Sequence, residues 1–113
     1  MPRRNVRLDR RTQKILAEVR DALREVYGAR LRRVCLYGSY ARHEQQDGSD
    51  MDILVVLDEI RSFGEELERV GDVGSRLSLE HDIAISSYPV DEWEFQNRNS
   101  AFLINVRREA ILV

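Results

Sequence analysis

The segment 51–57, MDILVVL, constrains the fold of this chain more than any other stretch of its sequence. After Asp52 the segment is continuously apolar, as expected of a central strand that is covered on both faces. Asp50 and Asp52 stand at its start, and because side chains alternate along a strand, both carboxylates point to the same side. Two like charges repel each other, so they need a partner, which water, a basic side chain or a metal ion would supply.

The remaining segments carry the patterns of helices, strands and a turn. Helical spacing of apolar residues predicts helices over 9–27, 62–80 and 90–113, the first ending at Gly28 and the last broken around Asn97–Asn99. Short apolar runs predict strands over 31–37 and 81–87, and 39–46 is predicted to make one or two helical turns with Ser39 as the N-cap. This order predicts an α/β or α+β fold, in which a small mixed β-sheet of three to four strands is flanked by helices.

Length and composition set further bounds. The 113 residues are predicted to form a single domain, 1–113. No apolar run approaches the ~20 residues that span a bilayer, and the start, MPRRNVRLDRR, lacks the apolar segment of a secretory signal. Cys35 is the single cysteine, which excludes an internal disulfide and indicates a reducing, cytoplasmic setting. The net charge of −2 creates no overall field for nucleic acid, which is not expected as the main partner.

A third acid, Asp82, stands at the start of the strand predicted over 81–87. If this strand pairs with 51–57, three carboxylates converge on one small site. Hard oxygen ligands of this kind suit Mg²⁺ or Mn²⁺, whereas the few histidines and the single cysteine argue against zinc. The alternative interpretation is structural: Asp50 caps a turn, Asp52 is a solvated strand end, and Asp82 pairs with an arginine.

The pair Gly38-Ser39 favours the metal interpretation of the acids. It follows the strand predicted over 31–37 and forms a compact bend, whose hydroxyl and backbone N–H groups suit phosphate oxygens. A phosphate cradle beside an acid triad is the equipment of metal-assisted phosphoryl or nucleotidyl transfer.

The stretch GSYARHEQQDGSDMDILVV resembles the minimal nucleotidyltransferases of the polymerase-β-like superfamily, antitoxin type. The pattern of that family is a Gly-Ser, about ten residues, an Asp-x-Asp, and a third acid on a following strand. Here ten residues, 40–49, separate Gly38-Ser39 from Asp50-Met51-Asp52. The resemblance covers about residues 30–90. One departure is His43, which stands where a glycine is common in the family.

The resemblance implies a role for each matching residue. Gly38 and Ser39 would hold the phosphates of ATP, and Arg42 would steady them. Asp50 and Asp52 would bind two Mg²⁺ ions, for which Mn²⁺ is an alternative, and Asp82 would complete the second metal site. Asp50, Asp52 and Asp82 are thereby the expected catalytic residues.

The resemblance also suggests an acceptor for the nucleotide. The chain has no room for the further domain with which relatives hold small acceptors, so the acceptor is expected to be a macromolecule. Small family members are typically encoded beside a HEPN ribonuclease toxin. As antitoxins, they transfer AMP from ATP to a tyrosine of that toxin. Two alternatives remain open: a small-molecule nucleotidyltransferase that acts as an oligomer, and a non-catalytic antitoxin or binding module. A complete acid triad argues against the second alternative, because a decayed site should have lost an acid.

Overall fold

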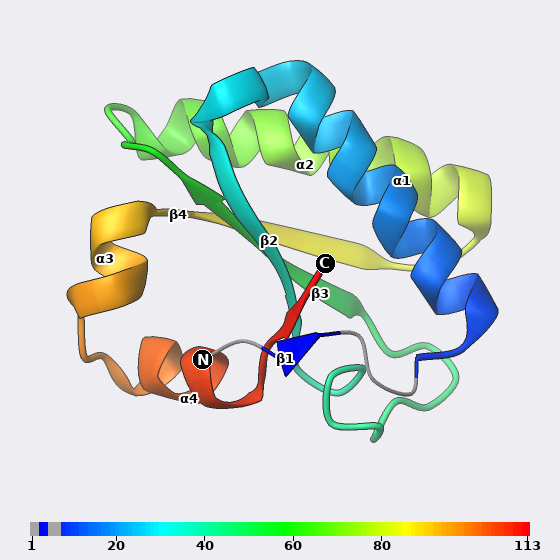
Figure 1. Cartoon of the computed structure of the whole chain (residues 1–113). Helices are drawn as coiled ribbons and strands as arrows, with labels where there is room; N and C mark the ends of the chain where they lie inside the picture. The colour runs from blue at the N-terminus through cyan, green and yellow to red at the C-terminus, as the bar shows by residue number, and fades with distance from the viewer. Residues whose placement is uncertain (1–2, 5–7) are drawn as a thin grey trace.

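The fold is built on one mixed β-sheet, seen in a computed structural model that describes residues 3–4 and 8–113. Within these residues the sheet has five strands in the order β1-β5-β2-β3-β4. The strands are β1 (Arg3–Arg4), β2 (Leu31–Tyr37), β3 (Met51–Leu57), β4 (Ile85–Asp91) and β5 (Ile111–Leu112). The helices are α1 (Arg10–Tyr27), α2 (Phe63–His81), α3 (Glu92–Asn97) and α4 (Ala101–Glu109), and a 3₁₀ turn, η1 (Gly28–Arg30), follows α1 (Figure 1). The predicted α/β architecture is confirmed.

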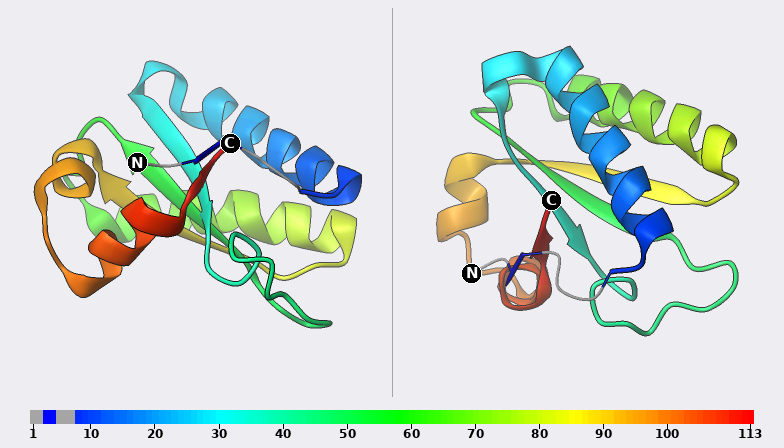
Figure 2. Two further views of the ribbon diagram at one scale, coloured as in Figure 1. Left: turned by 60° about the horizontal axis from the view of Figure 1, so that its bottom comes forward. Right: turned by 45° about the vertical axis from the view of Figure 1, so that its right-hand side comes forward.

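The central strand β3 lies between β2, which runs antiparallel to it, and β4, which runs parallel. Its side chains enter two separate cores. Met51, Ile53, Val55 and Leu57 pack in the core under α1 and α2, while Leu54 and Val56 pack in a second core with residues of α3 and α4. Figures 1 and 2 show the two helix pairs on opposite faces of the sheet. The expectation of a strand covered on both faces is therefore confirmed.

The helices begin and end close to where the sequence places them. Asp9 caps α1 by accepting a hydrogen bond from the Thr12 N–H at 2.7 Å, and Gly28 ends the helix. The predicted break in the C-terminal helix separates α3 from α4. In the part of the chain that the structure describes, no helix is both long and apolar enough to cross a bilayer.

Two short strands, β1 and β5, extend the sheet beyond the three to four strands that the sequence predicts. The two residues of β5 pair antiparallel with β2, and Ile111 is buried to 1% exposure. Two residues carry no periodic signal, so the sequence pattern does not separate them from the preceding helix. Because β1 and β5 extend one edge of the sheet, β4 is the outer strand at the opposite edge.

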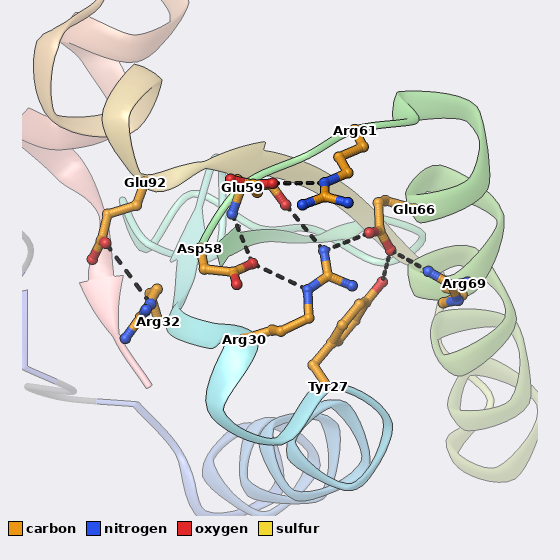
Figure 3. A network of polar contacts seen from close by, with 9 residues as sticks. All are labelled: Tyr27, Arg30, Arg32, Asp58, Glu59, Arg61, Glu66, Arg69 and Glu92. Atoms are coloured by element: carbon orange, nitrogen blue, oxygen red, sulfur yellow. Dashed lines mark hydrogen bonds and ion pairs between the residues drawn. The ribbon is translucent and has the colours of Figure 1, made fainter.

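A network of charged and polar side chains joins α1, α2 and the end of β3 (Figure 3). Its centre is Glu66, whose side chain is buried within α2. The Glu66 carboxylate accepts hydrogen bonds from Tyr27 at 3.0 Å, from Arg30 at 2.7 Å and from Arg69 at 2.8 Å. Arg30 also reaches Asp58, directly after β3, at 3.1 Å. The network therefore fixes the end of β3 that lies opposite Asp50 and Asp52.

Candidate active site

Asp50 and Asp52 lie where β3 begins, on the face of the sheet that α3 and α4 cover further along. Asp50 directly precedes the strand and is exposed, whereas Asp52 is half-buried. In the sheet register Asp52 lies opposite Tyr37 of β2 and Ser86 of β4. The charge of Asp50 acts on the Asp52 carboxyl, so the two acids lie close to each other.

The surroundings of Asp52 disfavour its own charge. Burial is the main cause that raises the pKa of this carboxyl, and the negative charges of Asp50 and Glu109 raise it further, while Arg42 lowers it. Net negative charge at a partly buried carboxylate pair favours binding of a cation. This geometry suits a divalent metal ion better than it suits an isolated salt bridge.

The turn after β2 lies directly against the Asp52 carboxylate. Gly38 has a φ of 75°, which favours glycine, and a Cβ at this position would overlap Oδ2 of Asp52 and lie 3.2 Å from its Cγ. The backbone therefore approaches the acid as closely as only glycine allows. The predicted return of the Gly-Ser turn toward the acids is therefore present where Gly38 meets Asp52.

We expect Gly38→Ala to destabilise the fold by about 2 kcal/mol, because alanine is strained at a left-handed φ and its methyl group would displace Asp52. Nucleotide binding should be lost with it. Gly48→Ala is the matched control, since Gly48 has a φ of 87° but open space around its Cα. Urea unfolding and nucleotide titration of both variants check this. Equal behaviour of the two variants would mean that contact with Asp52 is unimportant.

The segment that follows Gly38 is held by backbone hydrogen bonds. The Arg42 N–H donates to the Gly38 carbonyl at 3.2 Å, and the Glu44 N–H donates to the Ser39 carbonyl at 2.9 Å. Ala41 is fully buried in the core and anchors the segment. These are helix-like turns without a regular helix, so the expectation of one or two helical turns is only partly met.

His43 has a φ of 58°, a left-handed conformation. This explains why a glycine is favoured at the position, because most side chains are strained there. We expect His43→Gly to change the free energy of unfolding by no more than about 0.5 kcal/mol in the stabilising direction, since the relief of strain is partly offset by the greater freedom of the unfolded chain. His43→Val should destabilise by about 1 kcal/mol or more. Thermal unfolding of the pair checks the order, and a more stable valine variant would contradict it.

Arg42 is already engaged by two carboxylates. Its Nε donates to Glu44 at 2.8 Å, and its Nη1 donates to Glu109 at 2.9 Å. Glu109 ends α4, and its contact with the loop is not predictable from the sequence, because Glu109 and Arg42 are 67 positions apart. This pair joins the loop to the C-terminal helix next to Asp52.

The strand predicted over 81–87 is wrong, and with it the expected position of Asp82. Helix α2 continues to His81, and Asp82 caps it with a φ of 51°, while β4 begins at Ile85. The cap is closed by hydrogen bonds from the N–H groups of Asp82 and Ile83 to the Ser78 carbonyl. Such a cap is a common helix ending, and Asp tolerates the left-handed conformation.

The ligand atoms of the three predicted acids, Asp50, Asp52 and Asp82, do not all lie within 4.8 Å of one another. Within residues 8–113, the one group of three or more acidic, histidine or cysteine side chains with ligand atoms within 4.8 Å of one another is Glu18, Glu80 and His81, where α1 meets the end of α2. Asp50 and Asp52 by themselves offer adjacent hard oxygen donors. That donor set fits one divalent cation that also carries a nucleotide.

An aromatic surface continues from Asp52 along the same face of the sheet. Phe102 packs edge-on against Tyr37 at 5.5 Å and against Tyr88 at 6.0 Å between ring centroids. A cavity of about 420 Å³ lies among these rings, with Arg98 and Glu94 among its other lining residues. Burial and, to a lesser extent, the charge of Asp52 raise the pKa of Tyr37 to about 12, so its hydroxyl stays protonated at neutral pH.

Comparison with known proteins agrees with this geometry. A family model described as nucleotidyltransferase domain matches residues 16–109. The relative named "Putative protein adenylyltransferase MJ0604", from Methanocaldococcus jannaschii, is 32% identical over 86% of this chain and 92% of its own length. Protein adenylyltransferase MntA of Thermococcus cleftensis is 35% identical over 66% of this chain and 74% of its own length.

Solved structures share the fold at lower identity. A toxin–antitoxin structure with AMP-PNP has a TM-score of 0.60 and 16% identity, covering 83% of this chain and 68% of that chain. A mutant MntA-HpeT toxin-antitoxin structure has a TM-score of 0.58 and 19% identity, covering 95% of this chain and 72% of that chain. The family model, the identity to curated relatives and the shared fold lead to one conclusion: the chain belongs to the nucleotidyltransferase domain family and is an enzyme of that class.

Proposed function

We propose that this chain transfers AMP from ATP to a hydroxyl group of a partner toxin protein, in the presence of Mg²⁺, and thereby acts as an antitoxin. The observation that carries the proposal is the contact between the Gly38 backbone and the Asp52 carboxylate, with Asp50 beside it. It brings a phosphate-binding turn against a cation-binding pair. The relatives named as protein adenylyltransferases and the toxin–antitoxin neighbours support the choice of substrate and partner.

In this proposal Asp50 and Asp52 hold the metal ion, which is Mg²⁺ or Mn²⁺. When bound, the ion neutralises charge on the triphosphate and makes the α-phosphorus more electrophilic. Gly38 and Ser39 bind phosphate oxygens through backbone N–H groups and the Ser39 hydroxyl. The acceptor oxygen forms a bond to the α-phosphorus as the bond to pyrophosphate breaks, and the hydroxyl proton is released to water.

Arg42 has a place in this scheme as a phosphate contact. Its ion pair with Glu44 lies at the surface, where such pairs contribute at most about 1 kcal/mol. A phosphate group can therefore replace Glu44, while Glu109 continues to orient the guanidinium. Arg42 would then link nucleotide binding to the C-terminal helix.

We infer that the acceptor is a tyrosine of a HEPN-type toxin. Exposed aromatic side chains support an aromatic acceptor: Tyr88 and Phe102, which line the cavity with Tyr37, are each 43% exposed. Phe63, which packs against Tyr88 at 5.5 Å, is also 43% exposed. Large half-exposed aromatic residues gathered on one face are typical of protein contact surfaces.

A second candidate function is neutralisation of the toxin by binding alone. One observation favours it: β4 places no acid beside Asp52, so the argument from a complete triad no longer applies. In this case the toxin would be covered rather than modified, and the nucleotide would be dispensable.

Label transfer tests the proposed function directly. The chain is incubated with a HEPN-type toxin and ATP labelled with ³²P at either the α- or the γ-phosphorus. We expect label on the toxin from α-labelled ATP and none from γ-labelled ATP, because pyrophosphate leaves. Label from the γ-position would indicate a kinase. Label on an added aminoglycoside but on no protein would support the small-molecule alternative.

A further inference from the structure

The residue of β4 that lies beside Asp52 is Ser86. The two strands are parallel, and Asp52 is in register with Ser86. Neighbouring strands lie about 4.8 Å apart, and residues in register project to the same face of a sheet. Ser86 is exposed, so its hydroxyl is accessible from the side on which the carboxylates lie.

Neither neighbouring strand places an acid in register with Asp52. Along β4, the next residue on this face is Tyr88, which belongs to the aromatic surface. Before β4, the Ala84 carbonyl accepts a hydrogen bond from the Met51 N–H at 2.8 Å. On the β2 side, the position in register with Asp52 is Tyr37.

Two further acids come from outside these strands. Asp82 lies in the left-handed cap of α2, four residues before Ser86. Glu109 is near enough to raise the pKa of Asp52, but its carboxylate binds Arg42 at 2.9 Å. Neither is part of a metal-binding group with Asp50 and Asp52 among residues 8–113.

We propose that Ser86 occupies the third ligand position of the site, so that the chain with its nucleotide binds one divalent cation tightly and a second only weakly. The inference rests on the proposed function, because it assumes that Asp50 and Asp52 hold a metal–nucleotide complex. A neutral hydroxyl carries no charge to oppose that of Mg²⁺, which strongly prefers carboxylate or phosphate oxygens. Asp82, which the sequence offered for this role, is not a ligand.

If Ser86 occupies the third ligand position, Ser86→Asp should complete the site for a second cation. The new carboxylate would project beside Asp52 from a strand position that is exposed in the folded chain, so the fold should tolerate the change. Gln45→Asp, in the exposed loop before β3, adds the same charge away from the strands and is the matched control. Asp82→Asn removes the acid at the helix cap while keeping its size.

Manganese binding tests this without any turnover. The chain, in excess over the non-reacting analogue α,β-methylene-ATP, is titrated with Mn²⁺, and free Mn²⁺ is followed by its EPR signal. We expect one tightly bound Mn²⁺ per nucleotide for the wild type, for Gln45→Asp and for Asp82→Asn, and two for Ser86→Asp.

Each departure from this result has a separate meaning. Two tightly bound Mn²⁺ ions on the wild type would overturn the inference and leave the proposed function intact. A lower count in Asp82→Asn would overturn it by making Asp82 a ligand, and a single ion in Ser86→Asp would show that position 86 does not face the metal. If the analogue does not bind at all, the proposed function fails as well.

Discussion

Asp52→Asn is expected to reduce AMP transfer at least about 1000-fold, because the variant loses the carboxylate against which the Gly38 turn is built. Loss of a metal ligand in a transfer reaction removes several kcal/mol of transition-state stabilisation. Asparagine is nearly isosteric with aspartate, so the close approach of Gly38 is kept and the fold should not change. The measurement is initial-rate transfer from α-³²P-ATP to the partner toxin.

Two controls accompany this variant. Asp47→Asn removes a carboxylate from the exposed loop before β3 and should transfer AMP at the wild-type rate. Asp52→Asn should also still bind the toxin, which a pull-down with purified proteins would measure. If Asp52→Asn keeps full transfer activity, the role of Asp52 is refuted. If Asp52→Asn no longer transfers AMP but neutralises the toxin as well as the wild type does, binding alone is the mechanism.

Glu66→Ala is expected to destabilise the fold by about 2 kcal/mol. The substitution removes a buried carboxylate and leaves Tyr27, Arg30 and Arg69 without their shared acceptor. Breaking a buried ion pair costs about 3–5 kcal/mol, but the side chains of Arg30 and Arg69 are 38% and 49% exposed, so water compensates for part of this loss. Urea unfolding measures the difference. Glu68→Ala, at an exposed position of the same helix, is the control, and equal stability of the two variants would contradict the account.

The same network predicts how stability depends on pH. Burial alone would raise the pKa of Glu66, but hydrogen bonds from Arg30, Tyr27 and Arg69 outweigh it and hold this pKa below its ordinary value of 4.5. A carboxyl with a lower pKa in the folded state contributes stability above its unfolded pKa and loses it as the pH falls through the folded pKa. Between pH 7 and pH 3 the wild type should therefore lose more stability than Glu66→Gln, and parallel curves would contradict this.

The strands that the sequence predicts to the residue are the ones with two buried faces. Both 31–37 and 51–57 are short apolar runs with clear ends, Gly38 after the first and Asp50 before the second. Strand β4 has one exposed face and lies at the edge of the sheet, so its polar residues, such as Ser86, weaken the pattern. Helix α2 also ends without a glycine, because Asp82 itself adopts the left-handed conformation.

The candidate site was predictable as far as it depends on residues close in the chain. Spacing alone predicted that Gly38 returns to Asp52, since the segment 38–50, with ten residues between Ser39 and Asp50, joins two adjacent strands. The contributions of Ser86 and Glu109 depend on sheet register and on helix packing across many residues, which one sequence does not encode locally. The difference in the position of Asp82 has this origin: β4 begins four residues later than predicted, so Asp82 lies outside the strand.

The mass of the partner toxin after incubation with the chain, ATP and Mg²⁺ tests the central claim most directly. Intact-protein mass spectrometry should show an increase of one or more AMP residues with the wild type and none with Asp52→Asn, and fragmentation should place the adduct on a tyrosine hydroxyl. A toxin that is neutralised by the wild type while its mass remains unchanged would contradict the claim that this chain acts by transferring AMP.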